Sequence, residues 1–184
     1  MNNTKNLVRM SLFVALIAAG AFIKISITAV PLTLQLFFTT LAGVFLGAKL
    51  GALSVLCYIL LGLFGLPIFA GGGGPAYVLQ PTFGYLIGFV FGTFVTGTIA
   101  NRVPLPGMKR LLLANFAGLI IVYAFGMVYY WLIYRYYLGK GVAFRTMFLY
   151  CFLLPVPGDI VMSVLAAALG KRLMPVIRKE APAA

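Results

Sequence analysis

The sequence predicts an all-α integral membrane protein in which six transmembrane helices form a single domain over residues 1–184. Of the 184 residues, 63% are hydrophobic and 9% are charged, and the mean hydropathy is +1.10. A soluble domain has about 45–50% apolar residues and about 25% charged ones, so this composition indicates a membrane protein. The apolar residues gather in runs, and a helix needs about 20 of them to cross the hydrocarbon core of a bilayer.

Six apolar runs fit this requirement if the shorter ones are partly buried in protein. They place helices at about 7–25, 34–47, 51–65, 82–101, 111–138 and 147–173. Lys5 and Arg9 precede the first run as in a signal peptide, but no convincing cleavage site follows, so we expect a retained helix. Lys49 marks a tight turn between the second and third helices. Pro81 opens the fourth, because proline is tolerated in the first turn.

Small residues recur at every fourth position on two of the predicted helices. Ala15 and Ala19 share one face of the first helix, and Gly84, Gly88 and Gly92 share one face of the fourth. Small residues at this spacing let a second helix approach closely within lipid. From the residues alone, packing within the same chain is the favoured interpretation, and contact with a partner protein is the alternative.

The distribution of charge predicts how the helices are oriented. The net charge of +12 comes from 14 Lys and Arg residues against Asp159 and Glu180, and the cations flank the apolar runs. That pattern is typical of membrane topology and lipid-headgroup contact, and it does not favour nucleic-acid binding. With a cytoplasmic N-terminus, ten cations fall inside and four outside; the four are Lys24, Arg135, Lys140 and Arg145. The positive-inside rule therefore predicts a multi-pass protein of the cell membrane with both termini cytoplasmic.

Residue types that many reactions need are missing from the chain. There is no His, and Cys57 and Cys151 lie far apart within apolar runs. These residues cannot form a Cys/His metal site or a Ser-His or Cys-His nucleophile. No GxxxxGK[ST] motif is present, so the chain does not hydrolyse ATP by itself. The sequence predicts no enzyme and no metal or cofactor site, and uphill transport would need a partner protein or an ion gradient.

The stretch from Leu61 to Tyr85, LGLFGLPIFAGGGGPAYVLQPTFGY, interrupts the helices without a single charged residue. Four consecutive glycines, Gly71 to Gly74, lie among several prolines, so a helix cannot continue through it. Irregular backbone at membrane depth is tolerated where it is buried in protein or lines a cavity. The stretch is therefore either a lid or cavity wall at one membrane face, or an outer loop that only reverses the chain.

Asp159, in the segment PVPGDIVM, is the only acidic residue before the C-terminal tail. An ionisable group inside a membrane protein is a functional candidate, because burying it without a partner is costly. The alternative is a cap on free N–H groups at the start of the sixth helix. If that helix begins on the outer side, Asp159 and the glycine-rich stretch could line one cavity. Gln35, which opens the second helix, could bind a ligand or cap a turn.

Three segments resemble one family of transport proteins. They are VPLTLQ from Val30 to Gln35, LGLFGLPIFAGGGGPAYVLQPTFGYLIGF from Leu61 to Phe89, and LPVPGD from Leu154 to Asp159. They are similar, in the same order, to the biotin-specific S components, the BioY family, of energy-coupling-factor (ECF) vitamin transporters. The resemblance implies a six-helix substrate-binding domain over residues 1–184 that captures biotin from outside with high affinity. It also implies docking on a transmembrane coupling protein and two ABC ATPases through Ala15 and Ala19.

The same resemblance implies a dry pocket of Tyr and Phe rings around the ligand. The candidate ligand-binding residues are Asp159, Gln35, Gln80, Tyr85 and Asn115, with Gly73 and Gly74 letting the lid close. For the carboxylate of biotin, Lys24, Arg135, Arg145 and backbone N–H groups all remain possible partners.

Two positions depart from the family pattern. Met162 stands where a lysine is common, and Phe83 stands where a small glycine is frequent. The methionine leaves open an S component for a related acid, such as a biotin precursor or lipoate. A membrane assembly subunit without a ligand is an alternative of a different class.

Overall fold

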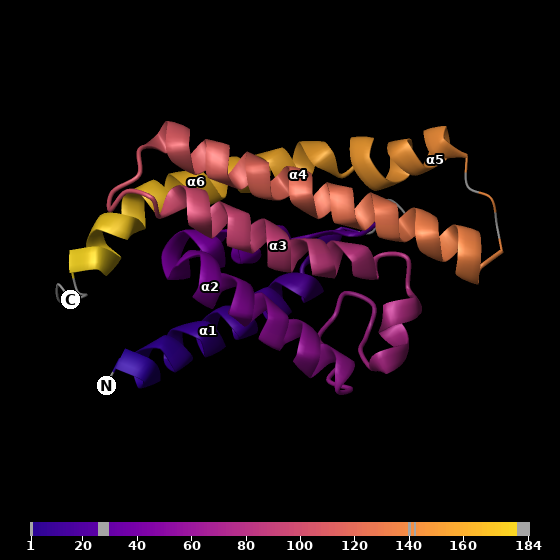
Figure 1. Cartoon of the computed structure of the whole chain (residues 1–184), viewed down its shortest axis with the longest axis horizontal. Helices are drawn as coiled ribbons and strands as arrows, with labels where there is room; N and C mark the ends of the chain where they lie inside the picture. The colour runs from indigo at the N-terminus through magenta and orange to yellow at the C-terminus, as the bar shows by residue number, and fades with distance from the viewer. Residues whose placement is uncertain (1, 26–29, 140, 142, 180–184) are drawn as a thin grey trace.

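The computed structural model is all-α and describes residues 2–25, 30–139, 141 and 143–179 (Figure 1). Its elements, in chain order, are α1 (Asn2–Phe22), β1 (Lys24–Ile25), β2 (Leu32–Thr33), α2 (Gln35–Leu63), η1 (Pro75–Leu79), α3 (Phe83–Ala100), α4 (Met108–Leu132), η2 (Ile133–Tyr137), α5 (Phe144–Phe148), η3 (Leu149–Leu153) and α6 (Val156–Lys179). η1 is a short 3₁₀ helix, whereas η2 and η3 are π-helical turns that continue α4 and α5. The predicted all-α membrane bundle is confirmed.

The helix α2 consists of two helical halves that meet at Gly47. Gly47 has φ 81° and ψ −178°, a backbone conformation that is essentially restricted to glycine. The chain folds back there: a Cβ placed on Gly51 would lie only 2.8 Å from the carbonyl oxygen of Ala42. The two halves correspond to the predicted helices 34–47 and 51–65. The reversal falls at Gly47, before the turn predicted at Lys49, because glycine permits this backbone.

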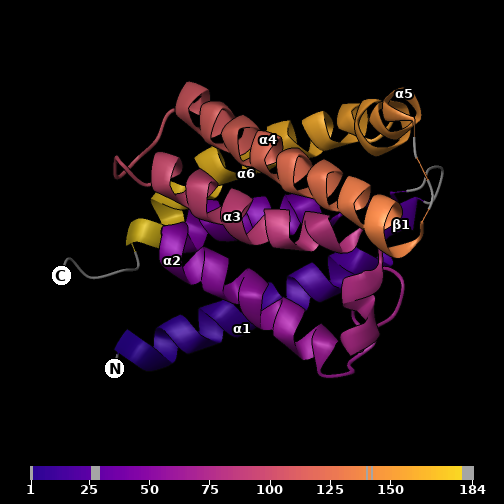
Figure 2. The ribbon, with the colours of Figure 1, turned by 45° about the vertical axis from the view of Figure 1, so that its right-hand side comes forward.

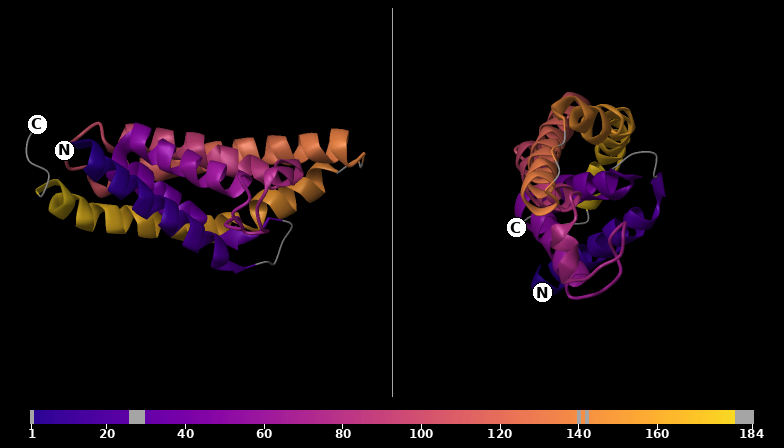
Figure 3. Two further views of the ribbon diagram at one scale, coloured as in Figure 1. Left: turned by 90° about the horizontal axis from the view of Figure 1, so that it is seen from below. Right: turned by 90° about the vertical axis from the view of Figure 1, so that its right-hand side faces the viewer.

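By length and composition, five helical stretches of the described chain could cross a membrane. They are Asn3–Phe22, Gln35–Leu63, Phe83–Ala100, Met108–Tyr137 and Phe144–Ile177. This count takes α2 as one stretch, although its two halves run in opposite directions. Six passes are therefore compatible with five stretches. As an even number of passes requires, α1 begins and α6 ends at the same end of the bundle (Figures 1 and 3).

The first predicted helix, 7–25, differs from the structure at both ends. α1 begins at Asn2 and ends at Phe22, because residues 24–25 leave the helix and pair antiparallel with residues 32–33. This ladder joins the two ends of the connection between α1 and α2. Residues 26–29 of that connection lie outside the described residues.

The last two predicted helices, 111–138 and 147–173, also shift. The fifth begins earlier, at Met108, because extended backbone at Gly107 ends the preceding turn (φ −70°, ψ 164°). The sixth begins with α5 at Phe144 and, after η3, ends with α6 at Lys179. The fourth predicted helix, 82–101, matches α3 to within one residue at each end.

The glycine stripe on α3 packs against α4, as the sequence favours. A Cβ on Gly84 would meet Tyr129 at 2.2 Å, and one on Gly92 would meet the carbonyl oxygen of Gly118 at 2.8 Å. Any larger side chain at these positions would separate the two helices. Because α3 also packs against α2, it holds the centre of the bundle.

The loop between α2 and α3, residues 64–82, is called the glycine-rich loop below. Together with β1, it lies at the end of the bundle opposite the start of α1 (Figure 2). The same end carries the start of α3 and the connection between α4 and α5 (Figure 1). The fold thus gathers the irregular backbone of several connections at one end of the bundle.

Candidate functional site

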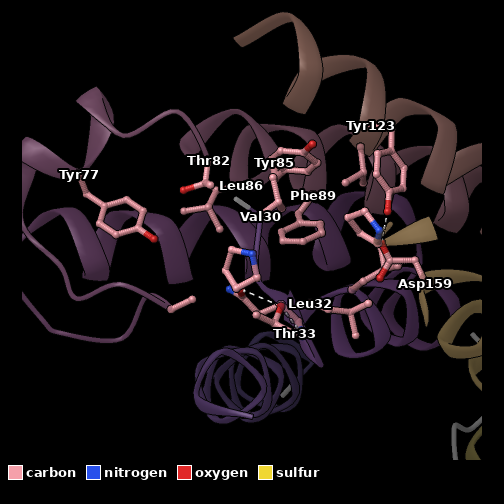
Figure 4. Close-up of a pocket in the computed structure, with 16 residues that line it drawn as sticks. Val30, Leu32, Thr33, Tyr77, Thr82, Tyr85, Leu86, Phe89, Tyr123 and Asp159 are labelled. Carbon is pink, nitrogen blue, oxygen red and sulfur yellow. Dashed lines mark hydrogen bonds between the residues drawn. The ribbon is translucent and has the colours of Figure 1, made fainter. Parts of the chain in front are cut away.

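A cavity lies at this end of the bundle, beneath the glycine-rich loop (Figure 4). Its walls come from the connection that contains β2, the start of α2, the glycine-rich loop, α3, α4 and the start of α6. The lining residues are Val30, Pro31, Leu32, Thr33, Gln35, Leu36, Ala70, Tyr77, Thr82, Tyr85, Leu86, Phe89, Val122, Tyr123, Pro155 and Asp159. Most of the lining is apolar or aromatic, which is typical of a small-molecule site.

Asp159 lines the cavity from the first turn of α6. Its carboxylate oxygen Oδ2 accepts a short hydrogen bond from the hydroxyl of Tyr123 on α4. β2 approaches this turn closely, because Gly158 has no side chain: a Cβ there would lie 2.3 Å from Leu32. Within the described residues, Tyr123 is the hydrogen-bond partner of the carboxylate. Asp159 is therefore held by another helix and does not simply cap its own.

Gln35 lines the cavity, but both ends of its amide are engaged by the protein. Its Nε2 donates to the hydroxyl of Tyr58 at 2.7 Å, and its Oε1 accepts from the hydroxyl of Thr33 at 3.1 Å. The Tyr58 hydroxyl in turn donates to the carbonyl oxygen of Ile68 at 2.9 Å. Gln35 therefore links the start of α2 to the glycine-rich loop through Tyr58.

Tyr85 contributes a ring to the cavity, whereas its hydroxyl points to the backbone. The hydroxyl donates to the carbonyl oxygen of Cys151 at 2.7 Å. The ring lies edge-on to that of Tyr123, with centroids 6.0 Å apart and an interplanar angle of 87°. Tyr85 thus presents an aromatic surface beside the Tyr123–Asp159 pair.

The glycine-rich loop is anchored over the cavity by Phe69. This ring is buried, and a Cβ on Gly62 would lie 2.1 Å from it, so the glycine provides the space that the ring fills. Gly74 adopts φ 97° and donates its N–H to the carbonyl oxygen of Gly62 at 2.7 Å. A Cβ on Gly73 would lie 2.2 Å from the carbonyl oxygen of Leu66, so this glycine also permits a close approach within the loop.

Aromatic rings continue from Phe69 along the loop to α4. Centroid separations are 4.5 Å between Phe69 and Tyr77, 6.4 Å between Tyr77 and Phe83, and 5.9 Å between Phe83 and Tyr129. The Tyr129 hydroxyl donates to the carbonyl oxygen of Val78 at 2.5 Å. Burial raises the pKa of the Tyr77 hydroxyl above its ordinary value. Phe83, which departs from the family pattern, is thus a buried member of this row.

Four of the residues predicted to bind the ligand do not line the cavity: Gly73, Gly74, Gln80 and Asn115. Gln80 is exposed on the glycine-rich loop. Asn115 is buried between α4 and α6, where its Nδ2 donates to the carbonyl oxygen of Ser163 at 2.8 Å. Met162 is half-buried and also lies outside the lining. A polar residue on an element that forms the cavity wall therefore need not face the cavity.

Among the cations proposed for a ligand carboxylate, Lys24 is bonded to the cavity wall. Its Nζ donates to the carbonyl oxygen of Ala70, a lining residue, at 2.5 Å. Arg135 on η2 and Arg145 on α5 are exposed and lie outside the lining.

Several lining residues were not candidates from the sequence, notably Tyr123, Tyr77, Phe89 and the segment 30–33. Tyr123 is the first of many aromatic residues between positions 123 and 137, and Tyr and Trp are typical of a membrane-interface belt. Tyr123 lies well inside α4, whereas residues of an interface belt lie near helix ends. This position was the feature of the sequence that could have indicated a cavity residue.

On α1, Ala15 and Ala19 are both exposed, together with Ser11 one turn earlier. The opposite face of α1 is buried through Phe13 and Ile17. The stripe of small residues thus faces away from its own bundle.

Comparison with known proteins gives a consistent result. The sequence model of the BioY family matches residues 1–179. The chain is 44% identical over 176 residues to the "Probable biotin transporter BioY" of Lysinibacillus sphaericus, which covers 96% of this chain and 90% of that protein. It is 37% identical over 183 residues to the "Biotin transporter BioY" of Rhizobium etli, with 94% of each chain covered.

Among solved structures, the fold matches the crystal structure of the S component for biotin from an ECF-type ABC transporter. The TM-score is 0.80 at 27% sequence identity, over 97% of this chain and 93% of that one.

The hydrogen bonds of the Tyr58 hydroxyl predict how much stability the protein loses when the glycine-rich loop is no longer bonded to α2. Tyr58→Phe keeps the ring but removes the hydroxyl that accepts from Nε2 of Gln35 and donates to the carbonyl oxygen of Ile68. We expect a loss of about 1–3 kcal/mol in the free energy of unfolding, measured by denaturant titration in detergent micelles. Tyr136→Phe, at an exposed position, is the matched control and should change stability little. Equal effects of the two substitutions would contradict the anchoring role.

Proposed function

Because the chain belongs to the BioY family, we propose that it is the high-affinity biotin-binding S component of an ECF-type ABC uptake transporter. It is a multi-pass membrane protein and not an enzyme. In this proposal residues 1–184 act as one substrate-binding domain, and biotin is the transported ligand, with no cofactor.

The observation that carries this proposal is the cavity that contains Asp159. The bicyclic head of biotin has ureido N–H groups that donate hydrogen bonds and an apolar sulfur ring. A carboxylate in a water-poor site is a strong acceptor for such N–H groups. Tyr123 donates to Oδ2 and fixes the orientation of the carboxylate, so Oδ1 can receive a ureido N–H.

Other parts of the cavity suit the apolar body of the ligand. The ring of Tyr85 lies beside Asp159 and offers an aromatic face to the bicyclic head. Gln35 supports the wall and holds the roof through Tyr58. Gly73 and Gly74 shape the roof from outside the lining, Gly73 by its close approach to Leu66 and Gly74 by its positive φ angle. Asn115 acts from outside the cavity by joining α4 to α6, and Gln80 is exposed outside the lining.

The distribution of cations supports cytoplasmic termini and an extracellular cavity. Lys49, Arg102, Lys109, Arg110, Lys171 and Arg172 lie in or beside the connections at the end where α1 begins. Lys24, Arg135 and Arg145 lie at the cavity end. The positive-inside rule then assigns the first end to the cytoplasm, so the cavity captures biotin from outside.

The exposed small stripe of α1 supports docking on a partner within the membrane. Helices associate in lipid through close packing of small residues, and Ala15 and Ala19 offer such a surface. We assign this stripe to the transmembrane coupling protein, which links the subunit to two ABC ATPases. Membrane lipid covers the other exposed apolar side chains.

Met162 lies outside the cavity, so the structure gives no support to lipoate or a biotin precursor as the preferred ligand.

Asp159→Asn tests the ligand and the acceptor together. Calorimetric titration of the purified protein should give nanomolar affinity for biotin and much weaker binding of lipoate. The Asn variant should bind biotin at least about tenfold more weakly, because it loses a charged acceptor. Thr98→Val, which removes an exposed hydroxyl on α3, is the control and should leave the affinity unchanged. Unchanged affinity in Asp159→Asn would remove the acceptor role, and selective lipoate binding would refute the biotin assignment.

Ala15→Trp and Ala19→Trp test the docking surface. A bulky ring on this stripe should abolish co-purification with the coupling protein, because it prevents close helix contact. Biotin binding should be retained, since both alanines are exposed and neither lines the cavity. Ile120→Trp, at a position on α4 that is 70% exposed, should leave co-purification intact. Assembly that survives both alanine substitutions would show that docking occurs elsewhere.

A further inference from the structure

We propose that Lys24 binds the carboxylate of the ligand at the mouth of the cavity and thereby selects anionic ligands and fixes their orientation. This inference rests on the proposed function, because it assigns the second polar end of the same ligand.

The first observation is the position of Lys24 between two parts of the cavity wall. Its backbone pairs with Thr33 in the β1–β2 ladder, and its Nζ reaches the carbonyl oxygen of Ala70 on the glycine-rich loop. Thr33 and Ala70 both line the cavity. The ammonium group therefore lies where the β-ladder meets the roof.

The second observation is that Lys24 has no acidic partner among the residues that the structure describes. The ammonium group carries three N–H donors, and Ala70 is its one hydrogen-bond partner within the described residues. Asp159 is the one acidic side chain in the described part of the chain, and it bonds with Tyr123. An incoming carboxylate would supply both the missing charge and the missing acceptor.

The third observation is that the two charged groups belong to opposite ends of the cavity. Figure 4 places Asp159 and Tyr123 at one end of the labelled residues and Tyr77 at the other. Gly71, the neighbour of Ala70, packs on Tyr77: a Cβ there would lie 3.5 Å from the Tyr77 hydroxyl. Lys24 is thus bonded to the wall at the Tyr77 end.

Between these ends Val30, Leu86 and Phe89 give the cavity apolar surface, and the Thr33 hydroxyl there is bonded to Gln35 (Figure 4). A ligand with an N–H donor head, an apolar middle and a carboxylate tail matches this order of groups. The reverse orientation would bring two carboxylates together at Asp159, and like charges repel strongly in a site of low dielectric constant. The charges therefore define one binding direction, with the head at Asp159 and the tail at Lys24.

The alternative cations lack this connection to the wall. Like Lys24, Arg135 and Arg145 are exposed and lie outside the lining at the same end of the bundle. Within the described residues, neither has a hydrogen bond to a lining residue. They serve as matched controls for a general electrostatic effect.

Lys24→Gln distinguishes the charge of Lys24 from its hydrogen bond to Ala70, because glutamine keeps an N–H donor but carries no charge. The probes are biotin and biotin amide, which have the same shape but differ in the charge of the tail. Calorimetric titration of the full chain in detergent should show that the unmodified protein prefers biotin over the amide by about tenfold or more. In Lys24→Gln, biotin should bind about tenfold more weakly while the amide binds as before, so the preference disappears. Lys24→Arg should keep it, and so should Arg145→Gln.

Each other outcome has a definite meaning. A preference for biotin that persists in Lys24→Gln would overturn the inference, and so would an unmodified protein that binds biotin and the amide equally. Equal weakening of both ligands in Lys24→Gln would also overturn it, because Lys24 would then act only through the roof. If the unmodified protein binds neither ligand, the proposed function itself fails, which is a different result.

Discussion

No water is available inside a bilayer to hydrogen-bond an exposed backbone group, and this constraint shapes the end of the bundle that holds the cavity. Apart from the short 3₁₀ helix η1, the glycine-rich loop is not helical, so several of its carbonyl groups need partners elsewhere in the protein. Three of them accept hydrogen bonds from side chains on other elements: Ile68 from Tyr58, Ala70 from Lys24 and Val78 from Tyr129. These bonds tie the loop to α2, β1 and α4, and the loop therefore forms a stable roof over the cavity.

The same end of the bundle divides its polar side chains between structure and binding. The amide of Gln35 and the hydroxyl of Tyr85 are engaged by the protein, so they shape the wall. Asp159 and Lys24 each retain hydrogen-bonding capacity, one as an acceptor and the other as a donor. With an apolar surface between them, the cavity matches a ligand that has a donor head and an anionic tail, as biotin has.

Local patterns in the sequence predict much of this structure. Long apolar runs predict the helices, and the glycine stripe of α3 predicts close packing on α4, because both depend on residues near one another in the chain. The turn between the two halves of α2 was predicted at Lys49, but it occurs at Gly47. Several glycines lie nearby, and the sequence does not show which of them adopts the positive φ angle. The bond between Tyr123 and Asp159 joins residues 36 apart in the sequence, so only the tertiary fold reveals it. Sequence likewise marks Gln80 and Asn115 as polar without showing that neither faces the cavity.

The central claim is that the glycine-rich loop roofs a ligand-binding cavity at this end of the bundle. Hydrogen–deuterium exchange of the backbone amides in residues 64–82, with and without biotin, tests it most directly, because exchange reports local opening. The account predicts that saturating biotin slows exchange in this loop and in the first turn of α6. Unchanged exchange in the loop, with slowing confined to the end where α1 begins, would contradict it.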